Sequence, residues 1–443
     1  MIFVNQGSSS FRERRPFFLA AVLVVLLGVW LRLYPPPVLG RTPDEKTYSQ
    51  FTQQILSLGW FEGVRTNVDT YLNNPNNWVY PPPTRIGYLA LCAAWAGLNG
   101  SASEESLARL SAAVSMLTLL LTCIFAWRWF GPWAGLVSAL VMAILPVELA
   151  IARRAWQDGV FTFASLLVVA AGVELVREDQ LSRKAFGTLT GRRLIPFLLA
   201  AAFIPWIKES APAIVAVTAA LVTVHALRKR RPLIEIGRFL AAVAGTMCLS
   251  FFVLACAMGG PAKYLQLYRN AGATHLKNTY GIDFQGGPWY SAFQSLILLN
   301  PGSTILWFFS LCILCIALCN WITRGEEPVQ IALGLFLFMF VLWICTVFLP
   351  YLKNMRYLSP LYAPFALMCG FGVGSVLDAL HAASTKTGES STARLVTLFV
   401  CAMLVFAAWT DYDHFRFYFL ERDTVDLVNR MLFRLRGWTY DYP

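Results

Sequence analysis

The sequence predicts an all-α polytopic membrane protein, because of its composition and its eleven apolar segments. Of its 443 residues, 57% are hydrophobic and only 14% are charged, with a mean hydropathy of +0.55, whereas soluble globular domains carry about 25% charged residues. A bilayer core of about 30 Å requires roughly 17 to 25 apolar residues per helix. The fifth and the eleventh candidate segments are the shortest. The candidates are 16–34, 107–129, 132–151, 159–176, 194–207, 210–228, 236–259, 303–323, 329–350, 358–378 and 395–410.

The first apolar segment is predicted to be an uncleaved anchor. Arg12, Arg14 and Arg15 precede it, as basic residues precede the apolar core of a signal peptide. No small-residue cleavage site follows the segment, and the proline-rich stretch "RLYPPPV" stands in its place. The segment is therefore expected to remain in the protein.

The stretch "IGYLALCAAWAGL" (86–98) is apolar but has only about thirteen residues, which suits an interfacial helix better than a span. If it does not span and the N-terminus is cytoplasmic, the basic stretches 177–193 and 228–232 both fall on the cytoplasmic side, as the positive-inside rule requires. Counting 86–98 as a span would place both outside. The resulting map has one transmembrane domain, 1–410, two long outer loops, 35–106 and 260–302, and an outer C-terminal tail, 411–443.

The net charge of +11 does not indicate a nucleic-acid partner. Basic inner loops explain part of it as topology signals, and no nucleic-acid-binding motif is present. The positive-inside rule leaves several outer basic residues unexplained, and these need another reason. They are Arg41, Arg85, Arg109, Arg153, Arg154, Lys208, Lys353 and Arg356.

Charged residues that are distant in the sequence map to the same outer boundary of the membrane. Ionisable groups at membrane depth are costly and suggest function by default. Taken singly, each has an ordinary explanation as a helix cap or a snorkelling turn. Taken together, carboxylates facing cations are what a phosphate-bearing lipid headgroup requires. The residues are Asp44, Glu45, Asp158, Lys208, Glu209 and Arg356.

The order of several motifs resembles the GT-C membrane glycosyltransferases, in the branch of protein O-mannosyltransferases and lipid A aminoarabinose transferases. No motif is specific alone; their order and topology are, from about residue 16 to 378. The motifs are "PDE..Y" (43–48), "YPPPTRIGY" (80–88), "PVELAIARRAWQDGVFTF" (146–163), "WIKESAP" (206–212), "GGPWYSAFQSLILLNPG" (286–302) and "MRYLSPLYAPFALMCG" (355–370).

This resemblance implies a GT-C fold with about eleven transmembrane helices, two outer loops carrying interfacial helices, and a polyprenyl-phosphate-linked sugar as donor. It implies that Asp44 is the first-loop catalytic aspartate, with Glu45 its neighbour, and that Asp158 is the second acidic residue. It also matches Lys208 and Arg356 to the family's basic residues. The chain departs from the aminoarabinose branch at two positions before the prolines, where the Glu and Lys of that branch are replaced. The two residues here are Val79 and Tyr80, and Arg85 is the candidate to replace the lysine.

The chemistry of the residues agrees with this expectation. An acceptor hydroxyl must lose its proton as it attacks the anomeric carbon, and Asp44 is the expected base. Negative charge accumulates on the departing lipid phosphate, and fixed cations there stabilise the transition state. Displacement with one base predicts inversion, since retention needs a carboxylate nucleophile. The expected phosphate-binding residues are Lys208 and Arg356, with Arg153, Arg154 and Arg85 behind them.

Sugar contacts and a metal site are left open. Tyr80, Tyr280, Trp289 and Tyr290 are candidates to contact the sugar or the acceptor, although tyrosine and tryptophan also line membrane interfaces. The sequence indicates no particular cofactor, and a divalent metal ion is left open, with Asp44, Asp158 and His275 as its candidate ligands.

The expected enzyme lies in the plasma or inner membrane and acts on the extracytoplasmic face, because sugar nucleotides are made in the cytosol and the donor must cross on a lipid. Its partners are this donor, membrane lipids and an acceptor that is a glycan, a lipid or a protein. The alternative is a transporter or flippase of lipid-linked sugars, which also combines charges with apolar helices. A non-catalytic scaffold is a third hypothesis.

Overall fold

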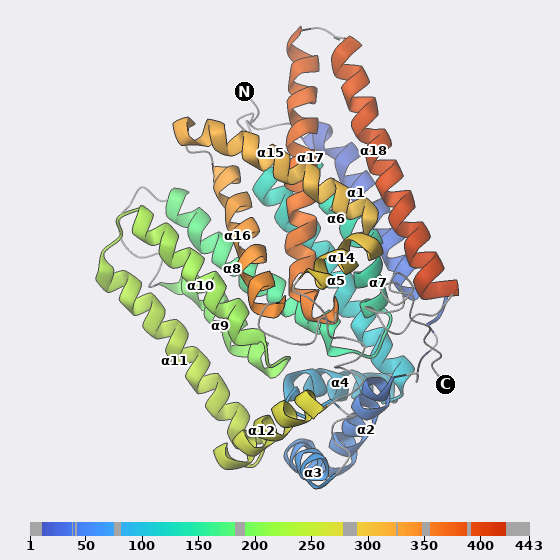
Figure 1. The fold of residues 1–443 in the computed structure, drawn as a ribbon, viewed down its shortest axis with the longest axis vertical. Coiled ribbons are helices and arrows are strands. Elements are labelled where there is room, and N and C mark those ends of the chain that lie inside the picture. Colours follow the sequence, from blue (N-terminus) through green and yellow to red (C-terminus); the bar gives the residue numbers. More distant parts are fainter. Residues whose placement is uncertain are drawn as a thin grey trace.

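The computed structural model describes residues 11–37, 39, 42–74, 81–181, 191–277, 290–324, 327–347, 355–387 and 391–421. These residues form helices and no strand, so the predicted all-α class is confirmed. The helices are α1 (Phe11–Leu33), α2 (Pro43–Leu58), α3 (Trp60–Asn73), α4 (Ile86–Asn99), α5 (Glu104–Phe130), α6 (Pro132–Ile144), α7 (Pro146–Ala152), α8 (Gln157–Leu181), α9 (Ile195–Phe203), α10 (Ala211–Arg228), α11 (Leu233–Ala257), α12 (Pro261–Lys277), α14 (Ser291–Leu299), α15 (Pro301–Arg324), α16 (Glu327–Val347), α17 (Ser359–Thr387) and α18 (Ser391–Phe415) (Figure 1).

Within the described residues, nine helices are long and apolar enough to cross a membrane, or ten if the bent pair α6–α7 is one span. The predicted count of eleven is therefore not confirmed. Segment 132–151 is broken between α6 and α7 with a bend of 62°, at Pro146, which has no N–H to continue the α6 hydrogen-bond ladder. Segment 194–207 forms only the nine residues of α9 and a short 3₁₀ turn, Ile204–Trp206.

Short helices from the two predicted outer loops form a layer across one end of the long helices. Loop 35–106 contains α2, α3 and α4, and loop 260–302 contains α12 and α14. Figure 1 shows α2, α3, α4 and α12 beneath the lower ends of the long helices. The 14 residues of α4 reach about 21 Å at 1.5 Å per residue, too short for a bilayer core, so α4 is not a span.

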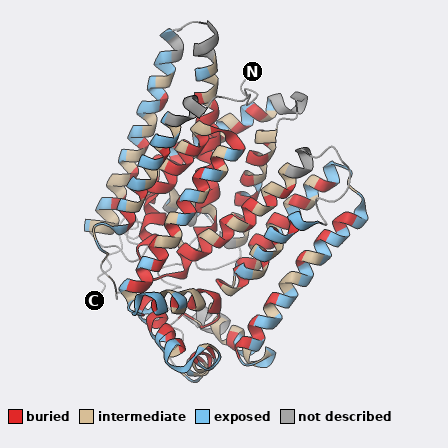
Figure 2. Ribbon diagram, turned by 180° about the vertical axis from the view of Figure 1, so that it is seen from behind, coloured by how far each residue is buried: buried red, intermediate tan, exposed pale blue. Residues whose placement is uncertain are grey.

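Small residues let the central helices approach closely. A Cβ atom added at Gly370 of α17 would lie 2.0 Å from the Ser138 Oγ of α6, and one at Gly374 would lie 2.7 Å from the Ala134 Cα. Such small-residue contacts are how membrane helices pack without a hydrophobic driving force between them. Buried residues are concentrated where the long helices meet, whereas α11 and α18 at the sides expose much of their surface (Figure 2).

One buried ion pair joins α1 to α7. Arg32 Nη2 lies 2.5 Å from Glu148 Oε2, and the two side chains are 0% and 2% exposed. Arg32 also donates from Nε to Ser115 (2.6 Å), from Nη1 to the Gly28 carbonyl (2.9 Å) and from Nη2 to the Met142 carbonyl (3.1 Å). The helical carbonyls and Ser115 surround the guanidinium, so this pair holds α1 against α5, α6 and α7.

Candidate functional site

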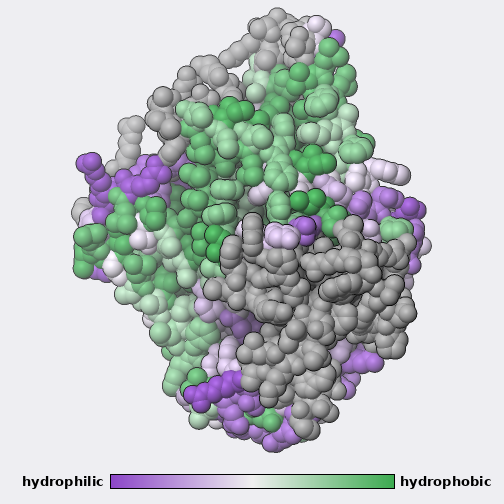
Figure 3. All heavy atoms as spheres, viewed as in Figure 1, coloured by the Kyte–Doolittle hydropathy of each residue, from purple (hydrophilic) through white to green (hydrophobic). Residues whose placement is uncertain are grey.

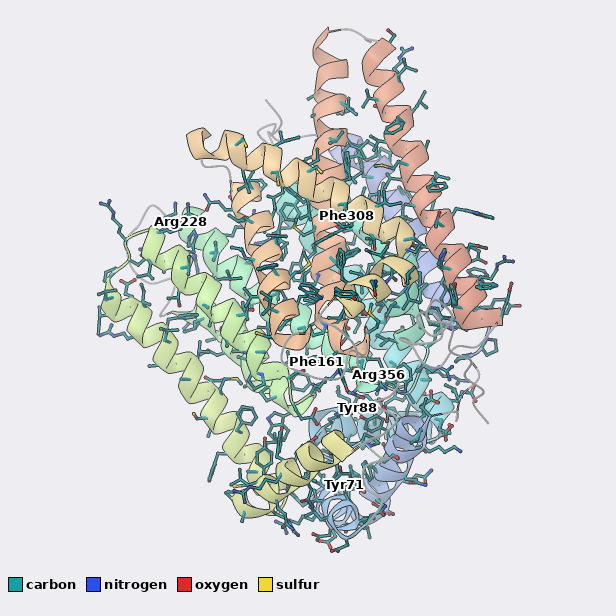
Figure 4. All side chains as sticks on the ribbon, in the orientation of Figure 1. Tyr71, Tyr88, Phe161, Arg228, Phe308 and Arg356 are labelled. Atoms are coloured by element: carbon teal, nitrogen blue, oxygen red, sulfur yellow. The ribbon has the colours of Figure 1, made fainter. Side chains whose placement is uncertain are left out.

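Four segments meet where the long helices reach the layer of short ones. They are the first turn of α2, the first turn of α8, the turn before α10, and the 3₁₀ turn Met355–Leu358 that precedes α17. Figure 4 shows Phe161, Arg356 and Tyr88 close to this junction. The sequence expectation that distant charged residues share one end of the molecule is met for the residues described below.

The start of α2 is fixed by its cap. Thr42 has an extended backbone and its hydroxyl accepts from the Glu45 N–H (3.5 Å), while Pro43 occupies the first helical turn. A threonine N-cap followed by proline is a strong helix start. Asp44 therefore projects from the first turn of α2, where the positive end of the helix dipole favours a carboxylate.

Four side chains form an alternating chain of charges. Asp44 Oδ2 lies 2.7 Å from Arg356 Nη2, and Arg356 Nε lies 2.9 Å from Asp158 Oδ2. Asp158 Oδ1 in turn lies 2.6 Å from Lys208 Nζ. We call these four residues the acid–base chain. Charge-assisted bonds of this length are strong, so each member is positioned by its neighbours.

The two halves of this chain differ in the exposure of their side chains. The side chain of Asp158 is 0% exposed and that of Lys208 is 5% exposed, whereas Arg356 and Asp44 are 17% and 22% exposed. Asp158 uses both carboxylate oxygens to hold the two cations. Asp44 is thus the carboxylate of the chain that a substrate can approach.

Aromatic rings enclose the two cations. The guanidinium carbon of Arg356 lies 4.1 Å from the centre of the Trp156 ring. Lys208 Nζ lies 5.2 Å from the ring centres of both Phe161 and Tyr357. Cation–π contacts of this kind stabilise a positive charge in a partly desolvated place.

A second group of side chains lies beside the acid–base chain. Arg85 donates from Nε to Glu209 (3.2 Å) and from Nη1 to the Tyr48 hydroxyl, which itself donates to Gln157 Oε1 (2.8 Å). The Thr84 hydroxyl also donates to Glu209. Since Gln157 precedes Asp158, this group connects the start of α4 to the start of α8.

Burial and neighbouring charges shift the pKa values of Glu209, Lys208 and Tyr48. Burial raises the pKa of Glu209, but the Arg85 guanidinium and the Thr84 hydroxyl outweigh it and hold the pKa below its ordinary value. Burial lowers the pKa of Lys208 even though Asp158 opposes that shift. Burial likewise raises the pKa of the Tyr48 hydroxyl, which stays protonated as a donor.

The predicted phosphate-binding residues do not all meet. Lys208 and Arg356 belong to the acid–base chain, and Arg85 reaches it through Tyr48 and Gln157. Arg154 lies 3.6 Å from Glu45 Oε1, so the second carboxylate of α2 faces another arginine.

Arg153 points elsewhere. Its Nη1 donates to the Leu31 carbonyl (2.9 Å) and its Nη2 to the Pro35 carbonyl, at the end of α1. It also lines a cavity of about 740 Å³ between α1, α2 and α5. This placement does not bring Arg153 to Lys208 and Arg356, because its donors are taken by the backbone that it holds.

Several predicted sugar contacts cannot be compared with the structure. Tyr80, Tyr280 and Trp289 lie outside the described residues, as does the side chain of His275. Tyr290 precedes α14 and is 43% exposed. The sequence motifs contain Tyr48, Trp156 and Gln157 but predicted no role for them, although Tyr48 follows Asp44 by four residues and therefore lies on the same helix face.

The arrangement does not fit a metal ion between Asp44 and Asp158, because Arg356 bonds to both carboxylates and already provides the cation. In the described part of the chain, no three His, Cys, Asp or Glu residues gather as metal ligands would. We derive no step through a metal.

Comparison with known proteins gives matches of structure only. No family model and no curated protein sequence matches this chain. The oligosaccharyltransferase of Archaeoglobus fulgidus, tethered to an acceptor peptide with the NVT sequon, superposes with a TM-score of 0.56 and 15% identity over 92% of this chain and 56% of that one. The same enzyme in complex with zinc and sulfate gives a TM-score of 0.55 and 15% identity over 89% and 53%.

ArnT from Cupriavidus metallidurans bound to undecaprenyl phosphate gives a TM-score of 0.54 and 15% identity over 95% of this chain and 77% of that one. The chain spans little more than half the length of the archaeal enzyme and about three quarters of ArnT. At this level of identity the likeness shows the fold. It confirms the GT-C architecture predicted from the sequence, and the chain is an integral multi-pass membrane protein.

Proposed function

We propose that this protein is a membrane glycosyltransferase that moves a sugar from a polyprenyl-phosphate donor to an acceptor hydroxyl. The observation that carries the proposal is the acid–base chain. It pairs a partly exposed carboxylate, Asp44, with Arg356, and it holds Arg356 and Lys208 on one buried carboxylate, Asp158. The GT-C fold supports it, since the structurally similar ArnT was captured with undecaprenyl phosphate.

Lys208 and Arg356 are proposed to bind the donor phosphate. Lys208 uses one of its three N–H groups on Asp158, and Arg356 offers a planar guanidinium suited to phosphate oxygens. As the bond from the anomeric carbon to the phosphate oxygen breaks, its electron pair stays on the leaving lipid phosphate. Cations fixed beside that oxygen stabilise the transition state more than the ground state.

Asp44 is proposed to accept the acceptor proton. Arg356 donates to Oδ2 of Asp44, so Oδ1 is the atom proposed to take the proton. The acceptor oxygen forms its bond to the anomeric carbon on the face opposite the leaving phosphate. One base and direct displacement give inversion of configuration.

The reacting end is proposed to face the extracytoplasmic side. Arg228, which begins the basic run 228–231, lies at the other end of the long helices from Arg356 (Figure 4), and such runs mark the cytoplasmic side. A donor reaching this side must already have crossed the membrane on its lipid. The acceptor remains a glycan, a lipid or a protein in this proposal.

The test is release of polyprenyl phosphate by the purified protein in detergent. The donors are undecaprenyl phosphates carrying radiolabelled hexoses or aminoarabinose, and the acceptors are fractions of an envelope extract. We expect protein-dependent release with at least one donor and one fraction, and label transferred to that fraction. A flippase or a scaffold would release no polyprenyl phosphate from the donor in micelles. Absence of release with every donor would overturn the proposal.

A further inference from the structure

A second groove lies between α8, α10 and α16, away from the acid–base chain. Its volume is about 260 Å³. Its floor is apolar and buried, with Val169, Val222 and Phe338 among its residues, and its edges at Val224 and Leu337 are exposed. Because α8, α10 and α16 are all spans, this groove opens sideways into the lipid.

The groove matches one leaflet in length. On α10 its lining runs from Thr218 to Lys229, which is about 16 Å at 1.5 Å per residue. This is about half of a 30 Å hydrocarbon core. A fatty acyl chain of a single leaflet fits such a length, whereas a long polyprenyl tail would extend beyond it.

Two glycines show where the groove is closed and where it is open. A Cβ atom at Gly172 would lie 2.4 Å from Thr218 Cγ2, so α8 and α10 touch there. A Cβ atom at Gly334 of α16 would have no heavy atom of another residue within 4 Å. The space above Gly334 is therefore available to a ligand.

The mouth of the groove is strongly basic. Its lining ends in His225, Arg228 and Lys229, and the basic run continues to Arg231. Two nearby carboxylates are engaged by arginines: Glu327 lies 2.8 Å from Arg177, and Glu174 lies 2.9 Å from Arg128. Figure 3 shows hydrophilic side chains at this corner of the molecule, above a hydrophobic surface. The apolar lining therefore ends at a cluster of cationic side chains.

We propose that this groove binds an anionic phospholipid, with one acyl chain between α10 and α16 and the phosphate at Arg228 and Lys229. The positive-inside rule would explain the basic run 228–231 by itself. It would not explain why an apolar groove as long as one leaflet ends at that run. The proposal does not depend on glycosyl transfer. Lipid bound here would hold α8, α10 and α16 together, and the first turn of α8 carries Asp158.

The experiment uses the full chain in nanodiscs of phosphatidylcholine. Either phosphatidylglycerol or phosphatidylcholine with a photoreactive group on one acyl chain is added in trace amount, and labelled peptides are found by mass spectrometry. We expect labelling of α10 and α16, with phosphatidylglycerol favoured at least about fivefold, as one basic residue near an anionic headgroup would give. Equal labelling by the two lipids would overturn the proposal.

One variant tests the binding of the acyl chain, and another tests the binding of the phosphate headgroup. Gly334→Leu fills the open space and should abolish labelling of α10 and α16 by both lipids. Gly245→Leu is the matched control, because a Cβ atom at Gly245 on α11 would likewise meet nothing within 4 Å, and it should leave labelling unchanged. The double variant Arg228→Gln with Lys229→Gln should lower phosphatidylglycerol labelling to the phosphatidylcholine level. Undiminished labelling in Gly334→Leu, or an undiminished preference in the double variant, would also overturn it.

Discussion

Two networks of charged side chains, the Arg32–Glu148 pair and the acid–base chain, differ in their surroundings. Around Arg32 and Glu148, both side chains are almost fully buried, and the other contacts go to helical carbonyls and Ser115. In the acid–base chain, three ion pairs join Asp44 to Arg356, Arg356 to Asp158 and Asp158 to Lys208, and Asp44 and Arg356 remain 22% and 17% exposed. A network closed by backbone can only hold helices together, whereas one that opens to solvent can exchange a partner for a substrate.

The largest expected effect separates the networks by stability. Glu148→Ala leaves Arg32 buried without its carboxylate, and breaking a buried pair costs about 3–5 kcal/mol. We expect that loss in the free energy of unfolding, measured by denaturant titration in detergent. The double variant Arg32→Met with Glu148→Met should regain most of it, because no charge is left unpaired. A double variant no more stable than the single one would mean that the network is not closed.

The next effect concerns rate. Lys208→Ala should lower the rate of polyprenyl phosphate release about 10²–10³-fold, the usual loss when one donor to a developing charge is removed. Arg356→Ala should act in the same direction. Lys208→Arg should restore only part of the rate, because a planar fork replaces a point charge. Lys263→Ala is the matched control, since Lys263 lies on α12 and pairs with Asp69. Parent rates in both alanine variants would refute the phosphate assignment.

A third prediction uses the group beside the acid–base chain. The folded pKa of Glu209 lies below its ordinary value of 4.5, so its stabilisation is present above about pH 4.5 and is lost as the pH falls through the folded pKa. Glu209→Gln should lower stability by about 1.5–3 kcal/mol at pH 7, as expected for bonds to a charged group. Melting curves between pH 7 and pH 3 should show this difference shrinking with acid. A constant difference would contradict the assignment.

The smallest expected effect is the loss of stability when an exposed ion pair is broken. Arg109 and Glu105 form an (i, i+4) pair on α5 and are 66% and 65% exposed. Such pairs contribute about 0.3–0.5 kcal/mol. Glu105→Gln should therefore change the unfolding free energy by no more than this, in the same denaturant titration. A loss comparable to that of Glu148→Ala would show that the stabilisation from an ion pair does not depend on how exposed the pair is.

The sequence was sufficient for the fold class and for four residues that meet. Hydropathy and span length predicted a helical membrane protein, and charge at membrane depth selected Asp44, Asp158, Lys208 and Arg356. It was insufficient for the number of spans, because hydropathy alone does not show that Pro146 breaks one apolar segment into α6 and α7 or that α9 ends after nine residues.

The sequence also could not separate neighbouring residues. Arg153 and Arg154 are adjacent, yet one holds the end of α1 and the other faces Glu45. Arg32 and Glu148 looked like parts of apolar stretches, and only folding brings them together. Which cations meet a carboxylate depends on helix rotation and on contacts far apart in the chain, and neither is encoded in local pattern.

The most direct test of the account compares Asp44→Asn with Glu45→Gln in the phosphate-release assay, together with binding of the intact donor. Asp44→Asn keeps the size and a hydrogen-bonding oxygen but removes the base, so release should fall about 10²–10⁴-fold while the donor still binds. Glu45→Gln should cost less, because Glu45 is buried against Arg154. Release by Asp44→Asn at the parent rate would contradict the account, and loss of donor binding would show that Asp44 binds the donor rather than accepting the proton.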